Sequence, residues 1–200
     1  GTQVTMIGKV TKELLYAHKA MPDFKTVQIL MGLPNRKDDT VMQALVEAVE
    51  TTGAKVVDQT ALIRPLMPLA GTLTKREPSA EEKQDMEFGF RMAKEIGRLD
   101  VGQTVVVKNL AVMALEAIEG TDACIRRGGQ LARGGAVVAK VAKPEQDNRF
   151  DVPAVGCKTI ETMVEAGAKA LVIEAGQTLL VEKDQVLQLA DDNGITIVAM

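Results

Sequence analysis

Charged side chains and glycines gather between residues 116 and 153. This stretch holds six acidic and six basic residues, so its formal net charge is zero. On a solvated helix face, opposite charges lie about three or four residues apart along one element. Here they fall where the apolar pattern predicts that elements end. Because binding and catalytic residues often lie on the loops between elements, we expect the chemistry of this chain in this stretch.

A strand-to-helix corner is predicted at Glu119–Asp122. The apolar run Ala111–Ile118 precedes it, and Thr121 and Asp122 are both good N-cap residues. The helix that follows is expected to end at Gly128-Gly129. The positive end of a helix and its backbone N–H groups can bind a phosphate at such a corner.

Basic residues follow the strand predicted at Ala136–Val141. Lys143 lies immediately before Pro144, which cannot continue a central strand. Residues 145–150 are therefore expected to form an exposed loop. Lys140 and Lys143 are three positions apart, so in a regular strand they would point to opposite faces.

Ordered blocks of the sequence resemble one enzyme family, the UDP-2,3-diacylglucosamine pyrophosphatases of the lipid A pathway in their non-metallophosphoesterase form. The similarity extends over nearly the whole chain. The blocks that carry it are Leu99–Gln103, Glu119–Asp122, Arg126–Gly129, Val138–Pro144, Gln146–Gly156 and Glu174–Gly176 with the sequence from there to the C-terminus.

This resemblance implies hydrolysis of UDP-2,3-diacylglucosamine to lipid X and UMP, with water attacking the α-phosphorus. It also implies a divalent cation such as Mg²⁺, which prefers a few carboxylates together with waters and phosphate oxygens. Asp151 is then the first choice as catalytic carboxylate, followed by Asp122 and Glu119, and the metal would be held by Asp122 and Asp151. The alternative is that Asp122 only caps a helix and Asp151 only holds a turn.

The same resemblance assigns the phosphates to basic and polar residues around the corner and the loop. Whether Arg126 and Arg127 bind phosphate or only offset the negative C-terminal end of their helix is left open. The expected substrate-binding residues are Gly120, Thr121, Lys140, Lys143, Gln146 and Arg149.

Composition argues against several other classes of protein. Only 2% of the residues are aromatic and the net charge is −3, so we expect no nucleic-acid partner. Cys124 and Cys157 are too few for a disulfide framework or a zinc site and are expected to be reduced thiols in or near the core. His18, the single histidine, is expected to be structural, which leaves proton transfer to carboxylates or metal-bound water.

No stretch approaches the roughly 20 apolar residues of a membrane span, and no signal peptide is recognised. We therefore expect a cytoplasmic protein. Because the implied substrate is a lipid-linked sugar nucleotide, the resemblance also implies transient contact with the inner-membrane surface. Leu66, Met67 and Leu69 could face lipid, although core packing is the plainer explanation. A homodimer is left open.

Alternating helices and strands predict an α/β fold, with a helix at Thr40–Thr52 and a longer one from the capping box of Ser79 and Glu82 to Ile96. A hairpin of Thr104–Lys108 and Ala111–Ile118 predicts a mixed sheet. By resemblance, the fold is a C-terminal α/β domain with a helix-flanked mixed sheet, preceded by part of a Rossmann-like N-terminal domain. The expected division is residues 1–63 for the end of the N-terminal domain, 64–73 for a linker and 74–200 for the catalytic domain, with a further segment before residue 1; a complete protein is the alternative.

Two functions follow from these patterns. The first is the hydrolase described above, and the second is a module that binds a sugar nucleotide or an anionic lipid without turning it over. The three acidic candidates favour the enzyme, because without a metal they would weaken the binding of an anion. The hydrolase further requires that the corner at Thr121 and the loop at Asp151 meet around one anionic ligand.

Overall fold

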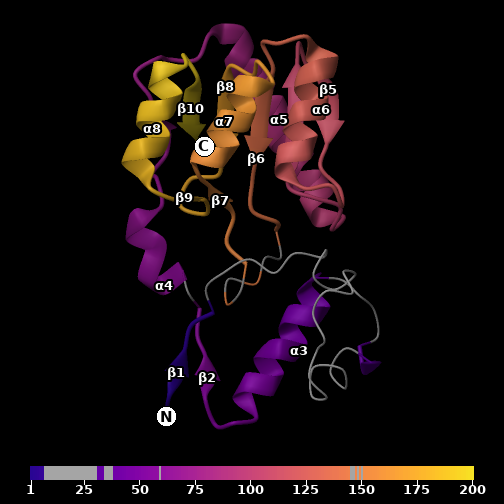
Figure 1. The fold of residues 1–200 in the computed structure, drawn as a ribbon, viewed down its shortest axis with the longest axis vertical. Helices are drawn as coiled ribbons and strands as arrows, with labels where there is room; N and C mark the ends of the chain where they lie inside the picture. Colours follow the sequence, from indigo (N-terminus) through magenta and orange to yellow (C-terminus); the bar gives the residue numbers. More distant parts are fainter. Residues whose placement is uncertain (7–30, 34–37, 59, 145–146, 148, 150) are drawn as a thin grey trace. The chain divides into compact units, whose positions relative to one another are not determined.

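The computed structural model describes residues 1–6, 31–33, 38–58, 60–144, 147, 149 and 151–200 (Figure 1). The chain divides into two compact units. The first contains residues 1–62 and 147–151, and the second contains residues 63–146 and 152–200. The boundaries predicted from the sequence stay a prediction, and His18 lies outside the described residues.

The described part of the first unit is a helix with two short strands. β1 (Gln3–Val4) pairs in parallel with β2 (Lys55–Val56). α3 (Asp38–Glu50) covers most of the helix predicted at Thr40–Thr52. It buries Val41 and Val46, which have exposed fractions of 4% and 0%. The apolar spacing therefore predicted this helix correctly.

The second unit is built on a six-stranded sheet with the strand order β3-β10-β8-β6-β4-β5. β6, β8 and β10 are parallel to one another, whereas β3, β4 and β5 run antiparallel to their neighbours. The predicted mixed sheet is thus confirmed. The strands are β3 (Gly71–Thr72), β4 (Thr104–Lys108), β5 (Ala111–Leu115), β6 (Val137–Lys140), β8 (Ala170–Ile173) and β10 (Thr196–Ala199), and a separate parallel pair joins β7 (Ala154–Val155) to β9 (Leu179–Leu180).

Helices cover both faces of this sheet (Figure 1). On β4, Val105 and Val107 belong to the cluster with Met86 of α5, while Val106 belongs to the cluster with Ile125 of α6. Alternate residues of a strand point to opposite faces, so α5 lies on one face and α6, α7 and α8 lie on the other. The helices are α5 (Ala80–Arg98), α6 (Thr121–Ala132), α7 (Cys157–Glu165) and α8 (Lys183–Asp192), and α4 (Thr60–Ile63) with the 3₁₀ turn Arg64–Leu66 leads into the unit.

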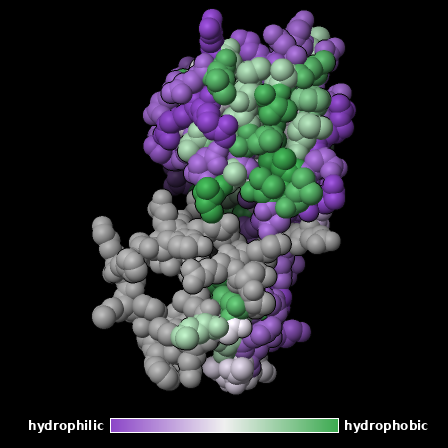
Figure 2. All heavy atoms as spheres, turned by 90° about the vertical axis from the view of Figure 1, so that its right-hand side faces the viewer, coloured by the Kyte–Doolittle hydropathy of each residue, from purple (hydrophilic) through white to green (hydrophobic). Residues whose placement is uncertain are grey.

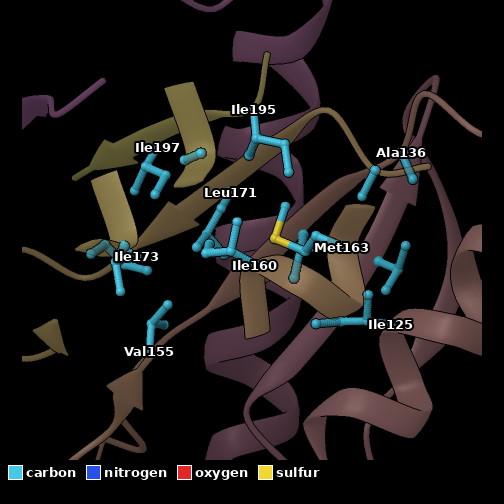
Figure 3. Packing of buried hydrophobic residues seen from close by; sticks show 14 of the residues in the cluster. Ile125, Ala136, Val155, Ile160, Met163, Leu171, Ile173, Ile195 and Ile197 are labelled. Carbon is cyan, nitrogen blue, oxygen red and sulfur yellow. The ribbon is translucent and has the colours of Figure 1, made fainter. Parts of the chain in front are cut away.

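Aliphatic side chains and methionine fill the face under α6, α7 and α8 (Figure 3). Ile160 and Met163 of α7 meet Leu171 of β8 and Ile197 of β10, all with an exposed fraction of 0%. A chain with so few aromatic residues therefore builds its core from branched aliphatic residues and methionine.

The start of α5 was predicted correctly, but the helix ends two residues later than the predicted end at Ile96. The Oγ of Ser79 accepts the N–H of Glu82 at 3.2 Å, and the Glu82 carboxylate accepts the N–H of Ser79 at 2.8 Å, which is the predicted capping box. The predicted stop at Gly97 is wrong, because the helix continues to Arg98. A Cβ on Gly97 would lie 3.4 Å from the Cα of Lys143. The segment at Lys143 therefore passes beside the helix at ordinary contact distance, which does not require glycine at this position.

The hairpin between β4 and β5 is confirmed, and a distant carboxylate holds its turn. Asn109 and Leu110 have φ angles of 52° and 59°, as in the two-residue turns that fit the twist of a hairpin. Leucine is unfavourable in this conformation. The buried carboxylate of Asp85 on α5 accepts both backbone N–H groups, at 2.9 Å and 2.6 Å. α5 therefore supplies the stabilisation that the turn sequence lacks.

The predicted limits of α6 are wrong at both ends. Its N-cap is Gly120, with a φ of 83°, so Thr121 and Asp122 lie inside the helix. The helix also passes through Gly128 and Gly129 to Ala132. A Cβ on Gly128 would lie 2.5 Å from the Cβ of Val106, and one on Gly129 would lie 2.4 Å from the carbonyl oxygen of Ala166. The two glycines therefore serve close packing.

We expect the substitution Gly128→Ala to lower the free energy of unfolding by about 1–2 kcal/mol. Alanine favours a helix by about 1 kcal/mol over glycine, but overpacking of a core costs about 1–3 kcal/mol. The upper part of that range, about 2–3 kcal/mol, applies here because three atoms of the Val106 side chain would lie 2.5–2.7 Å from the added Cβ. Urea denaturation measures the difference. Gly97→Ala is the matched control, because its nearest neighbours are at ordinary contact distance and the same helix preference should leave it at least as stable as the wild type. Equal stability of Gly128→Ala and the wild type would contradict the packing role.

Candidate active site

The carboxyl end of the parallel strands brings several predicted site residues to one edge of the sheet. β6 ends there with Lys140, and β4 begins beside it with Thr104, its partner in register. α6 begins at the same edge, because Thr121 in its first turn contacts Thr104. Ligands of open α/β sheets bind at this edge. It is therefore the candidate site in the second unit.

A row of polar residues, the sheet-edge row, crosses three adjacent strands here. The N–H of Glu116 donates to the carbonyl of Thr104 at 2.9 Å, which places Glu116, Thr104 and Lys140 side by side. Glu116 and Lys140 are 8% exposed, and Thr104 is fully buried. Register partners share a face of a sheet, and α6 covers this one. An acid, a hydroxyl and a cation thus lie under the start of α6.

Thr121 joins the sheet-edge row to the predicted corner. Its hydroxyl donates to Oε1 of Glu116 at 3.1 Å and lies 3.4 Å from the hydroxyl of Thr104. Thr121 has one hydroxyl proton, and Glu116 accepts it, so Thr104 is the donor in the second contact. A phosphate could receive this hydroxyl proton only if Glu116 released it. The N–H of Gly120 donates to the carbonyl of Ala117 at 3.4 Å, and no side chain of the described residues caps this end of α6.

Glu119, the third predicted catalytic carboxylate, is committed to Arg127. Nη2 of Arg127 donates to Glu119 and, at 2.8 Å, to the carbonyl of Leu115. Glu119 also accepts the N–H of Ala117 at 3.0 Å. The hydrogen bond from Arg127 holds the pKa of Glu119 below its usual value. Glu119 is therefore a weak base that fixes the turn before α6.

Arg126 and Lys143 also form ion pairs with carboxylates. Arg126 lies 3.2 Å from Glu165 of α7, so the two arginines left open by the sequence each have an acidic partner. Nζ of Lys143 lies 2.7 Å from Asp100, and the Lys143 side chain is 17% exposed. The position of Lys143 is therefore set by α5, which ends beside Asp100.

Arg149 and Asp151 belong to the first unit. The guanidinium of Arg149 donates to Asp147 at 2.6 Å and to Oε1 of Gln43 on α3 at 2.7 Å. The hydrogen bonds from Arg149 lower the pKa of Asp147. The N–H of Asp151 donates to the carbonyl of Asp147 at 3.0 Å, which holds a local turn. The direction of the Arg149 guanidinium is therefore set by Asp147 and Gln43.

The meeting of the two halves of the site stays a prediction. Asp122, half-buried in the first turn of α6, and Asp151 lie in different units. Gln146 lies outside the described residues. No cluster of three or more His, Cys, Asp or Glu suited to a metal occurs in the described part of the chain. Burial raises the pKa of Cys124 to about 12, so this thiol is no nucleophile.

Glu116 and Thr104 were not predicted as members of the candidate site. The pattern of the hairpin could not reveal them, because a regular register continued from the turn would pair Thr104 with Leu115. A register shift between Val106 and Val107 instead brings Glu116 opposite Thr104.

The fold and the site together define a two-part α/β protein with charged groups at the carboxyl edge of its sheet, a class that suits an anionic ligand. Profiles of the LpxI N-terminal domain and the LpxI C-terminal domain match residues 2–66 and 69–198. The chain therefore belongs to the LpxI family, and the resemblance seen in the sequence is confirmed.

Two kinds of relatives are similar to the chain. UDP-2,3-diacylglucosamine pyrophosphatase LpxI of Caulobacter vibrioides is 35% identical over 191 residues, which cover 90% of this chain and 68% of that protein. The bifunctional purine biosynthesis proteins PurH of Bradyrhizobium diazoefficiens and Chelativorans sp. are 29% and 28% identical over 63% of this chain. Because the match covers only 23% of each PurH protein, it carries no functional argument.

We expect Arg127→Gln to raise the pKa of Glu119 toward that of an ordinary glutamate, because the hydrogen bond from Arg127 is the largest cause of its lowering. A depressed carboxyl pKa stabilises the fold above the unfolded-state value, and this contribution is lost as the pH falls through the folded-state value. NMR titration of the carboxyl carbon measures the shift. Arg126→Gln, which removes the neighbouring pair with Glu165, should leave Glu119 unchanged. An unchanged Glu119 pKa in Arg127→Gln would contradict this assignment.

Proposed function

We propose that the chain is a hydrolase that cleaves the pyrophosphate of UDP-2,3-diacylglucosamine, with water attacking the α-phosphorus to give lipid X and UMP. The observation that carries this proposal is the 35% identity over 90% of the chain to a pyrophosphatase of that name. The lysines and carboxylates at the carboxyl edge of the sheet suit this reaction, because a cation can bind the pyrophosphate and a carboxylate can accept a proton. The alternative, a module that binds a sugar nucleotide or an anionic lipid without cleaving it, leaves the match to an enzyme unexplained.

The proposed phosphate ligands are cations whose side chains are held in place by ion pairs. Lys143 and Arg149 would hold phosphate oxygens, and their partners Asp100 and Asp147 keep each cation in place. An ammonium has three donors and a guanidinium has five, so a cation paired with a carboxylate can also bind a phosphate. Lys140, Gln146 and the backbone at Gly120 and Thr121 complete the proposed set of ligands.

Asp151, as general base or metal ligand, is the first proposed catalytic carboxylate, and Asp122 is the second. Proton transfer by a positioned side chain contributes about 10²–10⁴-fold to a rate. The ion pair of Glu119 with Arg127 gives Glu119 a structural role in this scheme. Asp151 would take the proton of the attacking water, while the cations bind the pyrophosphate.

A divalent metal, most simply Mg²⁺, would be held by Asp122 and Asp151. Mg²⁺ usually binds one or two carboxylates together with waters and substrate phosphates, so two aspartates fit it. When bound, it would offset the negative charge of the phosphates. Asp122 lies at the positive end of α6, where a carboxylate is stabilised.

An acylated substrate must be taken from a membrane, so we propose a cytoplasmic protein that transiently contacts the inner-membrane surface. Leu66 and Leu69 have exposed fractions of 61% and 83%, whereas Met67 is 6% exposed. Core packing therefore accounts for Met67 alone, and the two leucines are candidates for contact with lipid. None of the described helices has the length and apolarity to cross a bilayer.

We expect the protein, as its gene encodes it, to release UMP from UDP-2,3-diacylglucosamine, and Asp151→Asn to lower kcat at least about a hundredfold through loss of the base. Chromatography of UMP measures turnover. Asp184→Asn, at an exposed aspartate in the first turn of α8, is the control and should match the wild type. Binding without UMP release by the wild type would select the binding module, and unchanged kcat in Asp151→Asn would remove Asp151 from the site.

We also expect a chelator such as EDTA to abolish UMP release and added Mg²⁺ to restore it. Asp122→Asn should raise the Mg²⁺ concentration needed for half-maximal activity, because one of the two proposed ligands loses its charge. Asp184→Asn should need no more Mg²⁺ than the wild type. Full activity in EDTA would exclude the metal from the mechanism.

A further inference from the structure

A three-part contact, the Ala142 clamp, holds the backbone where the chain leaves β6. Nζ of Lys94, on α5, donates to the carbonyl of Ala142 at 2.9 Å and to both carboxylate oxygens of Glu174, at 3.0 Å and 2.9 Å. Oε2 of Glu174, which follows β8, accepts the N–H of Ala142 at 2.9 Å. The ion pair of Lys94 and Glu174 thus binds both the backbone C=O and the backbone N–H of Ala142.

The clamp replaces the strand pairing that ends at this point. β6 ends at Lys140, and Ala142 is 5% exposed, so its N–H and C=O need partners within the protein. Lys94 and Glu174 have side-chain exposed fractions of 29% and 19%. Three elements, α5, β6 and β8, are therefore joined at one residue.

α5 and the residues that follow it also contact the chain beyond Ala142. Gly97 faces Lys143 and Pro144. A Cβ added to this glycine would lie 3.4 Å from the Cα of Lys143 and from the Cδ of Pro144. Asp100 then binds the Lys143 ammonium at 2.7 Å. Lys94, Gly97 and Asp100 are three residues apart, so the last turns of α5 and the residue beyond them guide residues 142–144.

We propose that Lys94 and Glu174 are positioning residues for hydrolysis at this site. They fix the path on which the chain leaves the sheet, and thereby the placement of Lys143 and the start of the segment that leads to Arg149 and Asp151. This inference rests on the proposed function. Neither residue touches the substrate in this scheme; both act through the backbone of Ala142.

A shift of about 1 Å in a catalytic constellation can cost about a hundredfold in rate. We therefore expect Lys94→Met and Glu174→Gln to lower kcat by about ten- to a hundredfold. Lys94→Arg, which keeps the charge and the donors, should recover most of the loss. Amide hydrogen exchange at Ala142 should speed up in Glu174→Gln, because the acceptor of its N–H is weakened.

The chain offers a matched control at the other end of α5. Arg76 pairs with Glu82 at 2.7 Å and also donates to the backbone carbonyls of Lys169 and Gly194. Like the Ala142 clamp, this contact joins an ion pair to backbone groups, here the carbonyls of two residues, but it lies at the start of α5, far along the helix from Lys94. Arg76→Met should lower the Tm as much as Lys94→Met and leave kcat unchanged.

The result that supports the proposal is a loss of kcat in Lys94→Met and Glu174→Gln, recovery in Lys94→Arg and normal kcat in Arg76→Met. Equal losses in Arg76→Met and Lys94→Met would show that only stability matters, and unchanged kcat in both clamp variants would also overturn the inference while the proposed function stands. If Lys94→Met fails to fold, the nearly isosteric Glu174→Gln decides. A wild-type protein that releases no UMP would instead overturn the proposed function, and the inference with it.

Discussion

The close approach of α6 to the sheet is the constraint on which the site in the second unit depends. Gly128 lets the helix axis come near Val106, where any side chain would clash. Thr121 lies seven residues earlier, about two turns, and so projects from the same face of the helix. Because a helix is rigid over this length, the packing at Gly128 sets how deeply Thr121 enters the sheet edge. Its hydroxyl then reaches both Thr104 and Glu116.

At least six of the twelve charged residues between residues 116 and 153 form ion pairs with described residues. Glu119 binds Arg127, Asp147 binds Arg149, and Lys143 binds Asp100 outside the stretch. Each pair fixes a turn or the direction of a cation. Within the described residues, no ion pair involves Asp122, which separates it from Glu119 although both were predicted as catalytic. Local pairing thus accounts for part of the balance of charge seen in the sequence.

Local signals in the sequence predicted the elements well, and non-local contacts explain the failures. The capping box of Ser79 depends on neighbours in the chain, so the pattern was sufficient. The hairpin was predicted from its two apolar runs, although Asp85 of α5 holds its turn. Gly128-Gly129 looked like the end of a helix because glycine favours such ends and equally permits close packing, and only the partner, Val106 or Ala166, distinguishes the two. Glu116 was missed for the same reason, since its role follows from a strand register that no single segment displays.

The end of β6 is fixed from both faces of the sheet, and this suits the chemistry proposed for it. Lys140 lies on the face of α6 and α7, where its ammonium donates to the carbonyl of Ala154 at 2.8 Å. Two residues later, the backbone of Ala142 is held by Lys94 from α5, on the opposite face. A strand end held in this way can neither rotate nor slide without breaking a partly buried polar contact. Stabilisation of a charged transition state requires groups that are in place before the reaction begins, and a cation at the end of β6 meets that condition because its backbone is anchored on the two sides of the sheet.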